Sequence, residues 1–194
     1  MEQLRQAKLQ FADDGFAVIR TFLGCDEVDE FNREVERYIT NVIPKLPPEE
    51  AFYEVKGDLS TLKQLPRIDQ NDAYFHGFHR HQRMSELAAH LLGCAVVPRD
   101  LQWFNKPREI GKPTPAHQDG FYDNIEPIEM VNMWLALDPI NNDNGCMRYV
   151  AGSHKQGLRE HGRTHTLGFS QGVTDYGPED QANEIAICAA PGDM

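Results

Sequence analysis

The residues with the clearest capacity for chemistry lie in the stretch Pro115-Ala116-His117-Gln118-Asp119-Gly120. His117 and Asp119 are two residues apart, so in an extended segment their side chains point to the same face. An imidazole nitrogen and a carboxylate oxygen placed side by side can occupy adjacent positions on one metal ion. They are two of the three ligands of the facial triad that holds non-haem Fe(II) and leaves positions open for an oxo-acid and dioxygen. The spacing alone also occurs by chance in exposed polar segments, so its interpretation depends on the surrounding sequence.

Other polar clusters have simpler interpretations. The histidine-rich tract at residues 76–81 could bind metal, but its glycine and mixed neighbours favour a loop or the start of a helix. His161 and His165 are four residues apart, but the glycine between them argues against a zinc-binding helix. His154 is expected to be structural, in a turn. Ser153 has no obvious acid or base partner, so a hydrolase triad is unsupported.

Composition bounds the kind of protein. The chain has 194 residues, of which 40% are hydrophobic and 25% charged, as expected of one globular domain. Its net charge of −11, from 19 basic and 30 acidic residues, argues against nucleic acid as a partner, because phosphate binding needs a basic surface. No run of about 18 apolar residues occurs, so no membrane span is expected.

The expected location is the cytoplasm. The opening sequence MEQLRQAKLQ lacks the apolar stretch of a secretory signal. Four cysteines occur far apart, with no paired spacing, which favours buried thiols in a reducing compartment over a disulfide framework. They are Cys25, Cys94, Cys146 and Cys188.

The first half of the chain is predicted to be mainly helical. Leu4 to Asp14 reads as a short helix, followed by a short strand over Phe16–Ile19. A second helix is expected to open at the acidic turn beginning at Cys25 and to stop before Pro44, because apolar residues recur between them at helical spacing. A third covers Met84 to Leu92, and residues 44–60 are expected to form a loop.

The second half changes to short apolar or alternating runs that predict strands. These runs are Val96–Val97, Leu101–Asn105, Met130–Leu137, Met147–Val150 and Glu184–Cys188. Helices followed by strands predict an α+β or mainly β domain in which helices pack on one sheet. Short strands with long loops favour a jelly roll or barrel over a doubly wound sheet, and no glycine-rich nucleotide-binding motif is present.

Several motifs occur in an order that resembles the phytanoyl-CoA dioxygenase family. They are HQD at 117–119, WLALD at 134–138, NGCMR at 144–148 and AGSHK at 151–155. The stretch FADDGFAVI at 11–19 is similar to the family's N-terminal helix and strand. The likeness covers nearly the whole chain, and its specificity lies in the combination of motifs.

This resemblance implies a double-stranded β-helix, also called a cupin-like jelly roll, with N-terminal supporting helices. It implies Fe(II) as the metal and 2-oxoglutarate as the cosubstrate. His117 and Asp119 match the family's first two iron ligands. Trp134, Gln102 and Lys63 match positions that line or approach the 2-oxoglutarate pocket.

The family's third ligand is a histidine some residues past a Pro-Gly-Asp turn, and its 2-oxoglutarate-anchoring arginine lies further on. Pro191-Gly192-Asp193 resembles that turn, and neither later residue is present in positions 1–194. A jelly roll without its final strands would leave an open edge. We therefore expect residues 1–194 to be a single dioxygenase domain that lacks its C-terminal strands.

The implied activity is hydroxylation of an unactivated C–H bond in a small molecule, consuming dioxygen and 2-oxoglutarate and releasing succinate and carbon dioxide. Two alternatives stay open: a non-catalytic jelly roll that binds a small ligand, and a cupin-type metal hydrolase or isomerase. A substrate without coenzyme A is expected, because the chain is acidic and its few clustered cations, Lys106, Arg108 and Lys112, read as a solvated loop. The sequence gives no indication of oligomeric state.

Overall fold

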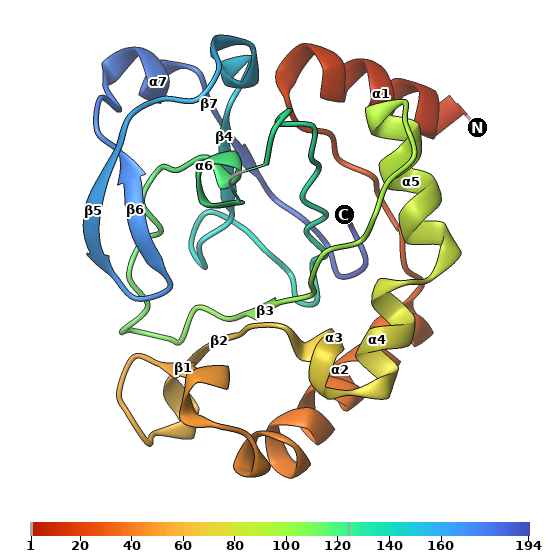
Figure 1. Cartoon of the computed structure of the whole chain (residues 1–194), viewed down its shortest axis with the longest axis vertical. Coiled ribbons are helices and arrows are strands. Elements are labelled where there is room, and N and C mark those ends of the chain that lie inside the picture. The colour runs from red at the N-terminus through yellow and green to blue at the C-terminus, as the bar shows by residue number, and fades with distance from the viewer. Residues whose placement is uncertain (1, 124) are drawn as a thin grey trace.

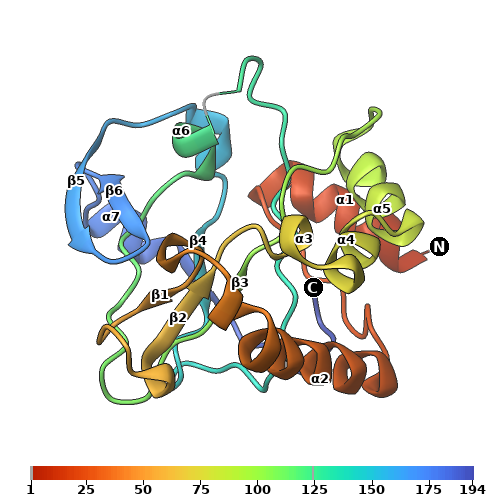
Figure 2. The same cartoon turned by 60° about the horizontal axis from the view of Figure 1, so that its bottom comes forward.

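The computed structural model describes residues 2–123 and 125–194, with most of the helices on one side and a β-hairpin with one short helix beside it on the other (Figures 1 and 2). The described α-helices are α1 (Glu2–Asp14), α2 (Cys25–Asn41), α3 (Ile68–Asn71), α4 (Ala73–His79), α5 (Gln82–Leu92), α6 (Asp119–Asp123) and α7 (Pro178–Ala182). The described strands are β1 (Phe52–Tyr53), β2 (Leu62–Leu65), β3 (Trp103–Phe104), β4 (Met147–Val150), β5 (His161–Thr166), β6 (Phe169–Val173) and β7 (Glu184–Ile187). None of these helices is long and apolar enough to cross a membrane.

The strands form three small antiparallel sheets. One has the order β1-β2-β3, the second pairs β4 with β7, and the third is the hairpin of β5 and β6. In the first sheet Gln64 lies opposite Phe104, and in the second the register runs from Met147 opposite Ile187 to Val150 opposite Glu184. The chain therefore has the predicted α+β character, with helices preceding most strands.

Helix α2 has the predicted course. Its buried residues, Val28, Phe31, Val35 and Tyr38, recur every three or four positions and form one face. The Gly24 N–H donates to the Glu27 carboxylate at 2.8 Å, which satisfies one free amide at the helix start. The helix ends at Asn41, before Pro44, as the sequence predicts. Helix α5 likewise ends at Gly93, whose φ of 76° suits a glycine.

The main apolar core lies between α2, β2, α3 and α4. Phe75 is its centre and is fully buried, with edge-on contacts to Phe31 at 5.4 Å and to Tyr38 at 5.6 Å between ring centroids. The other buried members of the cluster are Val35, Ala51, Leu62, Leu65 and Ile68. A second, smaller cluster joins α1 to α5 through Ala7 and Leu87. The two clusters of buried apolar side chains therefore lie mainly in the helical half of the structure.

Three of the predicted strands are wrong, and four observed strands, β1, β2, β5 and β6, are not predicted. Strand β1 lies within residues 44–60, which the sequence predicts to be a loop. Val96–Val97 is not a strand: it has no ladder partner among the described residues, and Val97 is 89% exposed. Phe16–Ile19 and Met130–Leu137 form no ladder either. Each meets the end of the chain in isolated backbone pairs, Ile19 with Met194 at 2.7 and 2.9 Å, and Ala136 with residues 192–193 at 2.8 and 2.9 Å. The β5–β6 hairpin escaped prediction because its sequence is polar and rich in glycine.

The turn at 191–193 ties the N-terminal segment to this region. The Asp193 side chain is only 5% exposed, and it accepts hydrogen bonds from Arg20 at 2.6 Å and from the Thr21 and Ala190 amides at 2.9 Å. Gly192 has φ +89°, and a Cβ at this position would lie 2.3 Å from the Leu23 carbonyl oxygen. Both the backbone conformation and the space therefore require glycine here.

Replacing Gly192 with alanine should destabilise the fold by about 3 kcal/mol or more, because strain at positive φ adds to a clash with backbone. Gly57→Ala is the matched control, since Gly57 has φ +85° but nothing lies within 4 Å of the place that a Cβ would take. That variant should lose only about 1 kcal/mol. Urea unfolding of both variants measures the difference, and equal losses would contradict the clash.

The Asp193 contacts also predict a dependence of stability on pH. Burial alone would raise the pKa of Asp193, but the bonds from Arg20, Thr21 and Ala190 outweigh it and hold that pKa below its ordinary value. Because the folded-state pKa is the lower one, the carboxylate stabilises the fold above the ordinary pKa of about 4, and this contribution is lost as pH falls through the folded-state pKa. Asp193→Asn should therefore be less stable than the parent at pH 7, with the gap closing under acid. Unfolding free energies measured across that range test it, and a constant gap would refute it.

Candidate metal centre

The H-x-D motif lies where an extended segment turns into a short helix. Residues 115–117 run beside β6, where the Val173 amide donates to the Ala116 carbonyl at 2.8 Å. Helix α6 begins at Asp119, and the Phe121 amide returns to the Gln118 carbonyl at 3.0 Å. His117 therefore ends the extended segment and Asp119 opens the helix. The expectation that one extended segment carries both residues is wrong, yet the structure still brings the two side chains together.

The two side chains approach each other through atoms that can bind a metal ion. His117 Nε2 lies 3.3 Å from Asp119 Oδ1. The other imidazole nitrogen, Nδ1, is 2.8 Å from the Pro115 carbonyl oxygen. A carbonyl can only accept, so Nδ1 carries the proton and the lone pair of neutral His117 is on Nε2. Two ligand atoms about 2.1 Å from one ion and at right angles lie about 3.0 Å apart, so the pair has a separation that fits a shared metal ion.

Asp119 is oriented from a distant part of the sequence. The Asn132 side-chain amide donates to Asp119 Oδ2 at 2.7 Å, which leaves Oδ1 facing His117. Partners that fix the direction of a ligand in this way contribute to metal affinity. Sequence analysis missed Asn132. The available signal was its position two residues before Trp134, inside the segment that carries the WLALD motif.

The pair influences its own protonation. Burial of His117 lowers the pKa of the imidazole, but hydrogen bonds to Asp119 and to the Pro115 carbonyl outweigh it, and the net pKa is raised. The hydrogen bond from His117 lowers the pKa of Asp119, with a further contribution from Asn132. Burial, and next the charge of Asp119, raise the pKa of the Tyr149 phenol. Without metal, the Asp119 carboxylate therefore favours the protonated form of His117.

Aromatic rings surround the imidazole. The ring centroid of His117 lies 5.0 Å from Phe169 and 6.0 Å from Tyr122. Phe169 in turn stacks against Phe104 of β3 at 6.0 Å. The Gln171 amide donates to the Tyr122 hydroxyl at 2.9 Å, so Tyr122 joins the motif to β6. These rings restrict movement of His117 and shield one side of it from water.

The other site residues predicted from sequence lie in separate surroundings. Lys63 is buried and pairs with Glu54 at 2.8 Å. Gln102 accepts a hydrogen bond from Gln64 and donates one to Asp100, both at 2.8 Å. Trp134 is half-buried. Within residues 2–123 and 125–194, no hydrogen bond or ion pair joins any of these three to His117 or Asp119.

The part of the chain that the structure describes holds only two ligands of the centre. No group of three or more His, Cys, Asp or Glu side chains among those residues could hold a metal ion. His161 is near the motif but both its ring nitrogens are occupied: Nδ1 lies 2.9 Å from the Arg159 carbonyl, and Nε2 accepts the Gln118 amide at 3.0 Å. It is a partner of the motif's middle residue and not a ligand.

The fold and the motif have relatives. The model of the family described as phytanoyl-CoA dioxygenase (PhyH) matches residues 11–194. The peroxisomal phytanoyl-CoA dioxygenase of Rattus norvegicus is 26% identical over 198 residues, covering 91% of this chain and 56% of that protein. The chain thus spans little more than half the length of this relative.

Two solved structures show the same fold. The epimerase SnoN, in complex with Fe3+, alpha ketoglutarate and nogalamycin RO, has a TM-score of 0.70 at 18% identity, covering 98% of this chain and 72% of SnoN. EctD from S. alaskensis, with 2-oxoglutarate and 5-hydroxyectoine, has a TM-score of 0.73 at 17% identity, covering 97% of this chain and 64% of EctD. The predicted double-stranded β-helix with supporting helices is confirmed by this likeness.

The family model covers all but the first ten residues, including every motif from FADDGFAVI to the Pro-Gly-Asp turn. The two side chains of its H-x-D motif approach to 3.3 Å through one imidazole nitrogen and one carboxylate oxygen. This chain belongs to the phytanoyl-CoA dioxygenase family.

Proposed function

We propose that the protein is an Fe(II)- and 2-oxoglutarate-dependent oxygenase in which His117 and Asp119 are two of the iron ligands. The observation that carries this proposal is the 3.3 Å approach of His117 Nε2 to Asp119 Oδ1, with each side chain oriented through its other polar atom. One neutral imidazole and one carboxylate are the donor types that suit non-haem Fe(II). Membership of the family also supports Fe(II) as the metal and 2-oxoglutarate as the cosubstrate.

When bound with 2-oxoglutarate and dioxygen, the iron supplies oxidising power sufficient for an unactivated C–H bond, with succinate and carbon dioxide as coproducts. The residues of this chain position and protect that chemistry. His117 and Asp119 hold the ion, and Asn132 directs the carboxylate. Phe169 and Tyr122 pack around the imidazole, which limits access of water to the ligand. No side chain is required to transfer a proton.

The cosubstrate residues expected from the sequence remain part of the proposal. Trp134 lies two positions beyond Asn132, the residue that binds Asp119, and this proximity in sequence supports a place for it near the cosubstrate. Gln102 lies two positions before Phe104. The Phe104 ring contacts Phe169, and Phe169 in turn contacts His117. The charge of Lys63 is paired with Glu54, so that ion pair has to open before Lys63 reaches the cosubstrate.

The third iron ligand and an arginine for 2-oxoglutarate are proposed to come from outside residues 1–194. Support comes from the two-ligand centre, since the described residues contain no third candidate. A single dioxygenase domain, a small substrate without coenzyme A and a cytoplasmic location stay predictions. Hydroxylation is the proposed outcome. SnoN, which has the same fold, is named an epimerase, so product analysis of this protein must distinguish hydroxylation from epimerisation.

Asp119→Ala should abolish the activity, because it removes the only carboxylate of the pair. In the full protein we expect Fe(II) affinity, and succinate formation from 2-oxoglutarate, to fall at least about 100-fold. Asp123→Ala is the control: it removes the same charge from the same helix, where Asp123 pairs with Arg99 at 2.5 Å. Equal succinate formation by Asp119→Ala and the parent protein would end the assignment.

Asn132→Ala should weaken metal binding without removing a ligand. The Asp119 carboxylate would lose its 2.7 Å hydrogen bond and could rotate away from His117, so affinity for Fe(II) should fall about 10- to 100-fold. Asn71→Ala serves as control, since the Asn71 amide also donates to a carboxylate, that of Glu50 at 3.5 Å, and touches neither ligand. Metal titration measures both variants. An unchanged affinity in Asn132→Ala would show that Asp119 needs no such support.

A further inference from the structure

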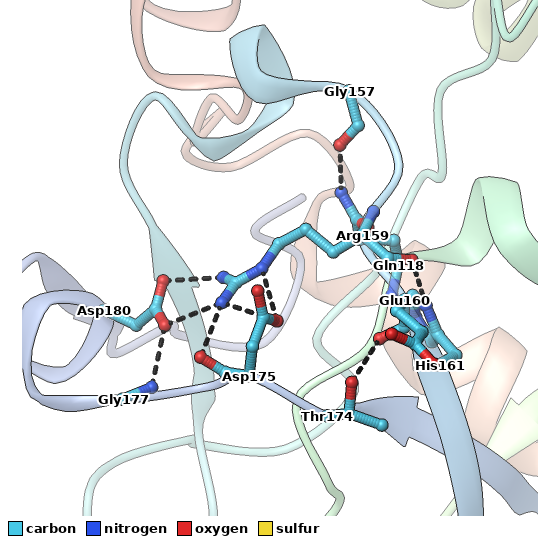
Figure 3. Close-up of polar contacts among 9 residues, drawn as sticks. All are labelled: Gln118, Gly157, Arg159, Glu160, His161, Thr174, Asp175, Gly177 and Asp180. Atoms are coloured by element: carbon cyan, nitrogen blue, oxygen red, sulfur yellow. Dashed lines mark hydrogen bonds and ion pairs between the residues drawn. The ribbon is translucent and has the colours of Figure 1, made fainter.

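The middle residue of the H-x-D motif is held more firmly than either ligand. Three hydrogen bonds join Gln118 to residues 157–161 (Figure 3). Its backbone amide donates to His161 Nε2 at 3.0 Å. Its side chain donates to the Gly157 carbonyl at 2.9 Å and accepts the Arg159 amide at 2.7 Å. A single distant segment therefore fixes both the backbone and the side chain of Gln118.

That segment is in turn anchored by the Arg159 side chain. The guanidinium forms a two-point contact with the Asp180 carboxylate at 2.7 and 3.1 Å. It also binds the Asp175 carboxylate and the Asp175 carbonyl, each at 2.9 Å. Figure 3 shows the arginine stretched between the motif at one end and the two aspartates at the other. Asp180 is itself fixed, because it accepts the Gly177 amide at 2.9 Å.

The contacts of the Arg159 side chain, here called the clamp, are half-buried at Asp180, whereas the Asp175 side chain is 65% exposed. The side chain of Arg159 is 17% exposed and that of Asp180 is 14% exposed. Bidentate, charge-assisted contacts of this kind impose geometry as well as energy. The segment has a further support next to Arg159, since the Thr174 amide donates to the Glu160 carbonyl at 3.0 Å. Residues 157–161 consequently have a fixed position relative to β6 and α7.

The position of Gln118 affects the two ligands through the backbone that it shares with them. The peptide groups on both sides of Gln118 set the directions in which the His117 and Asp119 side chains leave the chain. Metal sites need such side chains within about 0.5 Å of the productive geometry. A support that fixes Gln118 therefore restrains the backbone from which both ligand side chains extend.

We propose that Arg159 is a positioning residue for the metal centre, which holds His117 and Asp119 at their ligand spacing through residues 157–161 and Gln118. This inference rests on the proposed function only in that it takes His117 and Asp119 as metal ligands. It needs neither iron specifically nor turnover. Sequence analysis gave Arg159 no role, because its partners lie 16, 21 and 41 positions away.

The test compares Arg159→Met with Arg37→Met in the full protein, with Co2+ alone as the probe. Arg37 is a matched control, because its guanidinium also binds two carboxylates, Glu34 at 2.6 Å and Asp72 at 2.8 Å, but it joins α2 to the start of α4 and touches no residue of the motif. Visible absorption of bound Co2+ reports affinity and ligand geometry, and thermal unfolding reports stability. Arg159→Met should bind Co2+ about 10-fold or more weakly with an altered spectrum. Arg37→Met should lose stability while Co2+ affinity stays within about two-fold of the parent.

Two further variants keep the inference open to refutation if Arg159→Met does not fold. Arg159→Lys retains the charge but not the two-point contact, so its Co2+ affinity should lie between those of the parent and Arg159→Met. Asp175→Asn weakens the clamp from the other side and should also reduce affinity. Parent-like affinity and spectrum in the folded Arg159 variants would overturn the positioning role. Absence of Co2+ binding by the parent protein would overturn it together with the metal centre, whereas Co2+ binding without 2-oxoglutarate turnover would overturn only the proposed function.

Discussion

The metal centre depends on keeping an imidazole nitrogen and a carboxylate oxygen 3.3 Å apart and directed toward each other. Without a metal ion, the two side chains can bond to each other, because a proton on His117 turns their contact into a hydrogen bond. The raised pKa of His117 and the lowered pKa of Asp119 indicate this bond. A metal ion therefore has to displace a proton. Holding Nδ1 on the Pro115 carbonyl and Oδ2 on Asn132 keeps the ligand atoms in place for that exchange.

The supports for this pair come from far along the chain, whereas the apolar core lies mostly elsewhere. The buried cluster around Phe75 stabilises the helical half, and no member of it is a motif residue. On the hairpin side the positions are set by directional polar contacts, from Asn132, Arg159 and His161. Hydrogen bonds fix angles as well as distances, so they suit a site in which ligand direction matters more than burial.

Local patterns in the sequence predicted what local physics determines. Helices α2 and α5 follow from apolar periodicity and from their terminal residues, and the H-x-D motif follows from two residue types at a short spacing. The strand predictions for Phe16–Ile19 and Met130–Leu137 were wrong because both segments are apolar, but their backbone partners are single residues near the end of the chain. Asn132 and Arg159 could not be assigned, because an isolated asparagine or arginine carries no sign of the carboxylate it will meet.

The sequence motifs of this chain are joined to one another by contacts in the structure. HQD is attached by Gln118 to residues 157–161, which directly follow the AGSHK stretch. WLALD is preceded by Asn132, which binds Asp119, and its Ala136 pairs with Gly192 and Asp193 of the Pro-Gly-Asp turn. That turn binds Arg20 and Thr21, just beyond the FADDGFAVI stretch. Each motif is weak evidence alone, but together they specify a network of contacts around one pair of ligands. Each contact joins segments that are far apart in the sequence, and this is why the combination of motifs is informative where a lone H-x-D is not.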